Sequence, residues 1–299
     1  MSLGSDQLAD IFTAAGATGF VHAREIGVPD GPTVSLNPDE PVVLASVFKV
    51  PFAVAYSREV SAGRLEQTGR TTVTPRYRVG GLGTAGCDDD VEMSWRDLAK
   101  FMMTMSDNAA TDVVFHRIGQ AAVDAVLDDL KLKHTTIIGC GEDMDIQMMA
   151  DLGLDQGAAT PDIEALLGAA TPEQIWSLGI LDPARTPSST PRDIVTLLDA
   201  IWTNAAGSVE TCERVRSMMA QQIWRHRMAT GFDGNVLVAG KTGTLPAIRN
   251  EVGVVTYPDG RHYAVAVFTK AATLADPQPA IDASIGKAAR LAVDLLRGD

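Results

Sequence analysis

The stretch Asn250–Lys270, NEVGVVTYPDGRHYAVAVFTK, decides the expected fold of this 299-residue chain. Its two halves are rich in β-branched and aromatic residues, and the turn sequence Pro258-Asp259-Gly260 joins them, so the stretch predicts two antiparallel strands. The preceding NVLVAGKTG (Asn235–Gly243) predicts a third strand. A terminal helix is expected from about Pro279 to Arg297.

The amino-terminal end has the same kind of pattern. After a short helix, TGFVHAREI (Thr18–Ile26) and TVSLNPDEPVVLA (Thr33–Ala45) carry β-branched residues, and the turn sequence GVPDGP between them indicates a hairpin. Strand-rich segments at both ends of the chain predict one antiparallel sheet assembled from the two ends.

Between these ends the pattern is helical. Four Ser or Thr residues occupy expected helix N-cap positions, and three of them precede a proline that would begin the helix. They are Ser94, Thr160, Thr171 and Thr190. We therefore expect an α/β lobe from residues 1–40 and 222–299, a helical lobe from residues 41–221, and a functional cleft between the two lobes.

Size and charge limit the functions that are open to the chain. Its 45% hydrophobic and 21% charged residues are typical of a folded globular protein, and its net charge of −13 disfavours nucleic acid and anionic membranes as partners. No apolar run reaches the roughly 18 residues of a membrane span. We expect a monomer. Its compartment stays open: cytoplasmic for the chain as it stands, or secreted if a signal peptide has been removed.

Cysteine and histidine patterns give no metal or redox motif. Cys87, Cys140 and Cys212 are odd in number and share no C-x-x-C spacing, which favours free thiols. The five histidines form no H-E-x-x-H motif and accompany no G-x-S-x-G motif, which argues against a Ser-His-Asp hydrolase. We expect neither a metal nor a cofactor.

Three short motifs carry the chemistry: SVFK (Ser46–Lys49), SDN (Ser106–Asn108) and KTG (Lys241–Gly243). Each is weak alone, but their joint chance expectation is below about one in a thousand. In this order they are the signature of penicillin-recognising serine hydrolases, and the chain resembles class A β-lactamases over nearly its full length. The resemblance implies an α/β (α+β) fold, with a mainly antiparallel sheet covered by helices on both faces plus an all-helical lobe. It also implies acyl transfer through a serine ester.

Ser46 and Lys49 are the candidate nucleophile and its activating base. On a helix they share a face, and a lysine desolvated by the surrounding apolar residues loses part of its preference for the charged form. The alternative for Lys49 taken alone is a stem that lies on the core with its ammonium group in water. Pro51 predicts an irregular turn directly after Lys49.

The SDN motif stands at a helix junction. Asn108 is expected to cap a helix that begins near Ala109, and a turn with a cap is also the plain structural interpretation of the motif. The resemblance implies that Ser106 passes a proton to the leaving nitrogen and that Asn108 positions the amide side chain of the substrate.

The KTG segment ends an apolar strand. We expect the backbone N–H of Thr244 to point into the cleft and to form an oxyanion hole with the N–H of Ser46. The same segment is expected to bind a substrate carboxylate through Lys241, Thr242, Gly243 and Thr244. Arg227 is the expected second cation, with Arg225 and Arg249 as competitors for that role.

Glu142 is the candidate base for hydrolysis of the acyl-enzyme. It follows Ser106 by the same interval as the glutamate of class A enzymes, but the proline after that glutamate and the water-holding asparagine are missing. The alternative is a solvated acidic turn in which Glu142 lies beside Asp143 and Asp145.

An insertion at about residues 144–189 is a second departure from the family. Its two expected helices would either form a lid over the cleft or pack on the helical lobe. The leading function is a serine hydrolase that opens a β-lactam carrying a carboxylate. The alternatives are a related esterase, D-alanyl peptidase or biosynthetic hydrolase, and a covalent β-lactam-binding protein with slow deacylation.

Overall fold

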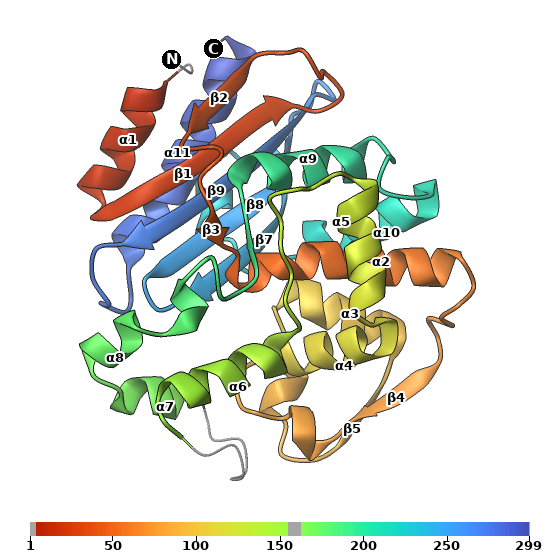
Figure 1. Ribbon diagram of the computed structural model, residues 1–299. Helices are drawn as coiled ribbons and strands as arrows, with labels where there is room; N and C mark the ends of the chain where they lie inside the picture. The colour runs from red at the N-terminus through yellow and green to blue at the C-terminus, as the bar shows by residue number, and fades with distance from the viewer. Residues whose placement is uncertain (1–3, 155–162, 299) are drawn as a thin grey trace.

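A computed structural model describes residues 4–154 and 163–298, and its centre is a five-stranded antiparallel sheet in the order β2-β1-β9-β8-β7 (Figure 1). The strands are β1 (Ala17–Glu25), β2 (Thr33–Leu36), β7 (Leu237–Leu245), β8 (Ile248–Thr256) and β9 (His262–Ala271). The predicted sheet from both chain ends is confirmed, and β1 joins the two ends by pairing with β9 from Ala17↔Ala271 to Glu25↔Tyr263.

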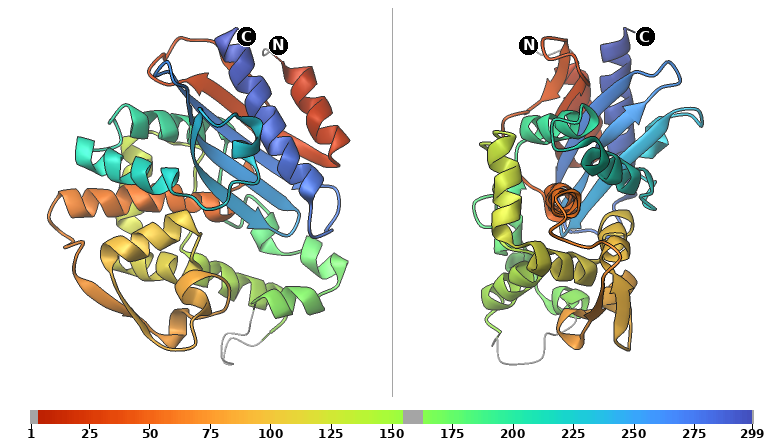
Figure 2. Two further views of the ribbon diagram at one scale, coloured as in Figure 1. Left: turned by 180° about the vertical axis from the view of Figure 1, so that it is seen from behind. Right: turned by 90° about the vertical axis from the view of Figure 1, so that its right-hand side faces the viewer.

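Helices cover both faces of the sheet, as expected. In chain order, the helices of the described residues are α1 (Ser5–Ala14), α2 (Lys49–Ser61), α3 (Trp95–Thr104), α4 (Asn108–Ile118), α5 (Gln120–Asp129), α6 (Gly141–Asp151), α7 (Ile163–Ala169), α8 (Pro172–Trp176), α9 (Pro191–Trp202), α10 (Val209–Ala220) and α11 (Pro279–Arg297). Figure 2 shows α1 and α11 on one face, with α2, α9 and α10 on the other. Two short ladders pair β3 (Val42–Val43) with β6 (Ser188–Ser189), and β4 (Arg70–Val73) with β5 (Val91–Ser94).

Strand β9 shows how one sequence serves both layers. Val265 packs in a cluster with α1 and α11, whereas the next residue, Ala266, packs in the cluster of α2, α9 and α10. Because both faces are covered, nearly every residue of the strand is buried, which explains its continuous apolar sequence.

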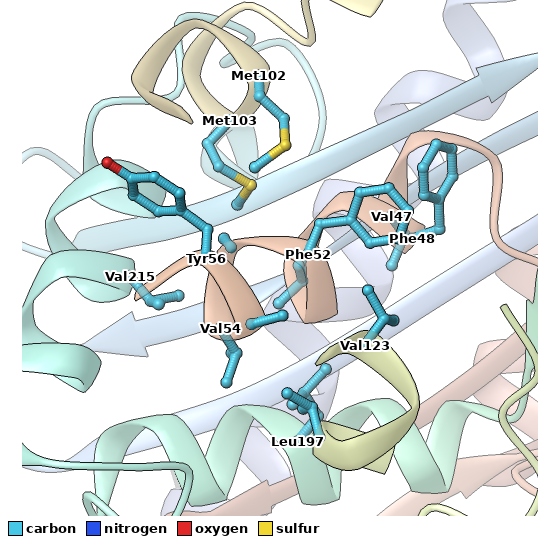
Figure 3. Packing of buried hydrophobic residues seen from close by; sticks show 14 of the residues in the cluster. Val47, Phe48, Phe52, Val54, Tyr56, Met102, Met103, Val123, Leu197 and Val215 are labelled. Carbon is cyan, nitrogen blue, oxygen red and sulfur yellow. The ribbon is translucent and has the colours of Figure 1, made fainter. Parts of the chain in front are cut away.

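Helix α2 runs through the centre of the helical layers (Figure 3). Phe52 lies with its ring centroid 5.0 Å from those of both Phe48 and Phe115. Each such fully buried side chain stabilises the fold by about 1.5–3 kcal/mol. The cluster around α2 also contains Val252 and Phe268 of the sheet. The division into an α/β lobe and a helical lobe over 41–221 therefore stays a prediction.

Three predicted N-caps are confirmed. Ser94, Thr171 and Thr190 each accept a hydrogen bond from the backbone N–H three residues later. The fourth, Thr160, lies outside the described residues. Within the described ranges, no helix is both long enough and apolar enough to cross a membrane.

The apolar residues of the inserted segment pack on one another and on the sheet. Ile163 and Leu167 of α7 lie against a cluster that contains Met148 of α6, also within the segment, and Ile248 of β8. The choice between a lid and packing on the helical lobe therefore stays a prediction, and Trp176 is 40% exposed.

Candidate active site

Ser46 lies on a short 3₁₀ turn, η1 (Ala45–Phe48), that follows strand β3. Asn250 of β8 holds the entry to this turn, because its buried amide donates to the carbonyls of Val43 at 2.9 Å and Leu44 at 3.2 Å. Ala45 adopts a left-handed φ of 46° to make the turn. The sheet therefore fixes the position of Ser46, and sequence reasoning did not identify Asn250.

Strand β7 approaches the turn closely at Gly243. A Cβ atom there would lie 2.6 Å from the carbonyl oxygen of Leu44 and 3.3 Å from the amide nitrogen of Ser46. Only glycine permits this approach. The predicted place of Gly243 in the site thus has a steric basis.

Lys49 begins helix α2 directly after the turn. Pro51 falls in the first turn of α2, where backbone N–H groups have no partner within the helix, so the proline removes no helical hydrogen bond. The predicted irregularity appears before Lys49, as the 3₁₀ turn η1, and not after it. Ser46 and Lys49 therefore stand on two joined helical segments.

Two buried lysines converge on Ser106. Lys49 Nζ donates to the Ser106 carbonyl at 2.7 Å, to Ser106 Oγ at 3.1 Å and to Asn108 Oδ1 at 2.8 Å. Lys241 Nζ donates to the same Ser106 Oγ at 3.0 Å and to the carbonyl of Thr242 at 2.9 Å. The three motifs, far apart in sequence, thus meet at one hydroxyl group.

Burial lowers the pKa of both lysines, because it disfavours their charged ammonium form. It lowers the pKa of Lys49 to about 8, although nearby aspartates oppose the shift. Burial, reinforced by the charge of Lys49, holds the pKa of Lys241 well below its usual value. A lysine in this state can lose a proton near neutral pH and act as a base.

Ser106 and Asn108 are positioned by the residue between them. Asp107, and not Asn108 as predicted, is the N-cap of α4, and its Oδ1 accepts from the N–H of Ala110 at 3.0 Å. The other oxygen of Asp107 accepts from the N–H and hydroxyl of Thr84 at 2.6 and 2.8 Å. Capping by Asp107 leaves the Asn108 side chain to contact Lys49. Ser106 itself adopts a left-handed φ of 67°.

The edge of strand β7 faces the nucleophile. The N–H of Thr242 donates to Gln222 Oε1 at 2.6 Å, so it points out of the sheet at this edge. Because alternate N–H groups of a strand point the same way, the N–H of Thr244 points to the same side. This supports the predicted oxyanion hole between Thr244 and Ser46.

A buried carboxylate supports this edge strand. Glu251 of β8 accepts from Gln222 Nε2 at 2.7 Å and from the backbone N–H of Met228 at 2.6 Å. Gln222 is thereby oriented to accept from Thr242. Neither Gln222 nor Glu251 was identified from the sequence, because no motif marks a positioning residue.

Arg227 lies beside strand β7. Its guanidinium is buried and donates to Asp282 Oδ1 at 2.6 Å, to the carbonyls of Gly243 and Asn250, and to Thr244 Oγ1 at 2.9 Å. Since Thr244 accepts from Arg227, its own hydroxyl proton is directed toward another acceptor. Of the competitors, Arg249 lines the same cavity as Arg227, whereas Arg225 is exposed and contacts Val238.

Ser46 stands between two cavities. The larger, about 450 Å³, lies on the side of Arg227 and Trp224. The smaller, about 130 Å³, lies on the side of α6 and the inserted segment. Ser46, Asn108 and Thr244 line both cavities, so a group attached to Ser46 is accessible from two directions.

Glu142 is not among the residues that line these two cavities. Its two carboxylate oxygens accept from Arg76 at 2.9 and 2.8 Å, and His116 Nε2 lies 3.5 Å away. The alternative of a fully solvated acidic turn also fails to describe it, because this carboxylate is paired and only 27% exposed. Glu142 as the base for hydrolysis stays a prediction that these contacts disfavour.

His116, Cys140 and Glu142 offer three possible metal-binding atoms within 4.8 Å of one another. Zinc uses such donors. Arg76 already occupies both oxygens of Glu142, however, and a second cation there would lie beside a guanidinium. The contacts therefore favour an ion-paired start of α6 over a metal site.

Asp145 of α6 is the acidic residue that lines the smaller cavity beside Ser46. It is half-buried, and burial together with the charges of Asp112 and Glu142 raises its pKa to about 7. Asp112 accepts from the backbone N–H groups of Gly141 at 2.8 Å and Glu142 at 3.0 Å, which fixes the start of α6. The sequence pattern placed Asp145 only in an acidic turn.

The fold, and the convergence of Lys49 and Lys241 on Ser106 in the cavity that Ser46 lines, are those expected of penicillin-recognising serine hydrolases. A model of the Beta-lactamase enzyme family matches residues 4–296, and the chain belongs to that family. A serine acyl-enzyme is the general mechanism of this family.

Two curated relatives cover most of the chain. The β-lactamase regulatory protein BlaB of Streptomyces cacaoi is 29% identical over 97% of this chain and 96% of its own. The extended-spectrum β-lactamase PER-1 of Pseudomonas aeruginosa is 27% identical over 82% of this chain and 72% of its own. The named relatives therefore include both a regulatory protein and an enzyme.

Solved structures share the fold. A β-lactamase from Sphaerobacter thermophilus matches with a TM-score of 0.76 over 99% of this chain and 98% of its own, at 24% identity. The structure of PBP-A matches with a TM-score of 0.76 over 99% of this chain and 96% of its own, at 20% identity. The α/β fold predicted from the sequence is thus confirmed.

Proposed function

We propose that this protein is a serine hydrolase that opens a β-lactam by forming an acyl-enzyme on Ser46 and then hydrolyses the ester. One observation carries the proposal: Lys49 and Lys241 share the hydroxyl of Ser106, which lines the same cavity as Ser46. A serine with buried lysines nearby has what it needs to become a nucleophile.

The proposed acylation begins at Ser46. Neutral Lys49 takes the proton of Ser46, whose oxygen attacks the lactam carbonyl. The N–H groups of Ser46 and Thr244 stabilise the negative charge on the carbonyl oxygen, a contribution of about 3–4 kcal/mol per donor in such sites. Ser106, between the two lysines, passes its proton to the leaving nitrogen as the ring C–N bond breaks, and it takes the proton that Lys49 received from Ser46 in return.

The larger cavity fits a substrate that carries a carboxylate. Arg227 and Arg249 line it and supply positive charge, and the Thr244 hydroxyl, held by Arg227, is directed to donate. Asn108 lines the same cavity and is proposed to bind the amide side chain of the substrate. We propose that the active form is a monomer.

A second candidate is a covalent β-lactam-binding protein that deacylates slowly. The specific observation in its favour is the pairing of Glu142 with Arg76, which withholds the expected base. The name of BlaB, a regulatory protein, is also consistent with this role.

The test measures turnover of a chromogenic cephalosporin together with the intact mass of the protein. The leading proposal predicts repeated turnover, with an adduct of the ring-opened mass on Ser46 at early times. Ser46→Ala is expected to show neither signal, while the surface variant Ser217→Ala keeps both. An adduct that persists without turnover supports the binding protein, and the absence of both turnover and adduct contradicts both candidates.

A further inference from the structure

We propose that Asp145, and not Glu142, takes the proton of the water that hydrolyses the acyl-enzyme. This inference rests on the proposed function, since it concerns the second step of the same reaction. It assigns a catalytic role to a residue that the family pattern does not mark.

The position of Asp145 carries the inference. It lines the smaller cavity together with Ser46, Asn108 and Thr244. These three residues also line the larger cavity, where the substrate is proposed to bind. A substrate that occupies the larger cavity therefore leaves the side of α6 as a route by which water can reach the ester carbon.

Shape also favours water in this smaller cavity. Its volume of about 130 Å³ holds only a few water molecules. Met144, Met148, Ile163 and Leu167 contribute apolar walls. Besides Ser46 and Thr244, the polar side chains that line the cavity are those of Asp145 and Asn108. A water molecule there therefore has a carboxylate that can accept a hydrogen bond and an amide that can orient it.

Glu142 is held away from this route. Arg76 binds both of its oxygens, and His116 Nε2 lies 3.5 Å from one of them. Both oxygens of Glu142 are thus engaged by Arg76, and Glu142 does not line the smaller cavity. Asp112 is likewise committed, because its two oxygens accept from the N–H groups of Gly141 and Glu142.

The electrostatics of Asp145 suit a base near neutral pH. The groups that act on it are Asp112 of α4, Glu142 of its own helix and Lys49 of α2. The two carboxylates and burial raise its pKa to about 7, whereas Lys49 opposes the shift. A base with a pKa close to the working pH combines a large ionised fraction with good proton affinity.

The proposed step balances as follows. The water oxygen forms a bond to the acyl carbon while one water proton passes to the Asp145 carboxylate. The tetrahedral intermediate collapses, the bond between the acyl carbon and Ser46 Oγ breaks, and Oγ receives the proton that Asp145 took from the water. Asp145 is thereby ionised again, Lys49 stays neutral, and the product leaves as a carboxylic acid that carries the second water proton.

The experiment compares two chemically matched variants on one helix, Asp145→Asn and Glu142→Gln. Each is acylated with penicillin G, and decay of the adduct is followed by intact mass. Removing a general base slows its step by about 10²- to 10⁴-fold, so Asp145→Asn is expected to accumulate the adduct. Glu142→Gln is expected to decay within about threefold of the parent rate, as for loss of an exposed ion pair.

A measurement on the unaltered protein complements the variants. Because the base must be ionised, deacylation should rise about tenfold per pH unit below pH 7 and level off above it. A flat profile from pH 5 to 8 overturns the assignment, and so does an adduct that persists only in Glu142→Gln. An adduct that persists in the parent protein also overturns it while leaving acylation intact; failure to form any adduct contradicts the proposed function instead.

Discussion

The two sides of Ser46 are built by different means. On the side of β7, hydrogen bonds link Ser106 to Lys49 and to Lys241 of the strand. The free edge of β7 is held by Gln222, which accepts from the N–H of Thr242. On the side of α6, the contacts are a few carboxylate pairs and apolar side chains of the inserted segment. The first side is thus held by hydrogen bonds between several elements, whereas the second is formed largely by one face of α6.

The rotation of α6 decides which carboxylate meets the cavity. Residues three apart on an α-helix differ by about 60° around its axis, since each residue advances about 100°. Glu142 and Asp145 have this spacing. A rotation of about 60° would therefore turn Glu142 to the direction that Asp145 now takes, and the contacts of Asp112 and Arg76 oppose this rotation.

The largest effect is expected from Lys49→Ala on the β7 side. Loss of the base should slow acylation by about 10²- to 10⁴-fold, measured as the rate of adduct formation with penicillin G. In the parent protein the acylation rate should rise with pH up to about 8, because the neutral lysine is the active form. The exposed Lys133→Ala serves as the control. A Lys49→Ala rate close to that of the parent would contradict the assigned role.

Gly243→Val should produce the next largest effect. The added atoms would meet the backbone of Leu44 and Ser46, so β7 must move and one donor of the oxyanion hole is lost. Such a loss costs about 10²- to 10³-fold in rate. Gly234→Ala, where a Cβ meets nothing within 4 Å, is the matched control. If acylation by Gly243→Val is unchanged while the fold is intact, Thr244 does not form the hole.

Some features of the fold and of the two sides of Ser46 could be predicted from the sequence, and others could not. The sheet and most N-caps follow from local patterns, because β-branched runs and Ser or Thr before a helix act through neighbouring backbone. Ser46, Lys49 and Ser106 could be predicted because they lie in short motifs, in which acyl transfer requires a hydroxyl group and a basic amine at set positions. Asn250 and Glu251 could not be found this way, since their partners are distant backbone groups.

Glu142 shows the limit of positional reasoning. Its place in the chain agrees with that of the family glutamate. At the start of α6, its backbone N–H donates to Asp112 of α4. The direction of its side chain depends on Arg76, which is 66 residues away in sequence. A spacing rule fixes where a residue stands along the chain but not which of two neighbouring directions its side chain takes.

Asp107→Ala tests stability rather than chemistry. It removes the cap of α4 and leaves the hydroxyl of buried Thr84 without its acceptor, which should lower the free energy of unfolding by about 2–4 kcal/mol. Ser208→Ala, an exposed cap of α10, should cost only about 1 kcal/mol. Denaturant unfolding measures both. Equal losses would mean that Asp107 is only a helix cap and does not tie the loop of Thr84 to the site.

The smallest effect is expected from Arg76→Ala, which frees Glu142 on the α6 side. An exposed ion pair of this kind contributes about 0–1 kcal/mol, so stability should change little. If Asp145 is the base, the rate of adduct decay should stay within about threefold of the parent, because the released glutamate lies outside the smaller cavity. A decay rate that rises tenfold or more would show that Arg76 had been restraining a competent base. The double variant Arg76→Ala/Asp145→Asn separates these cases, since only a released Glu142 could restore decay when Asp145 is absent.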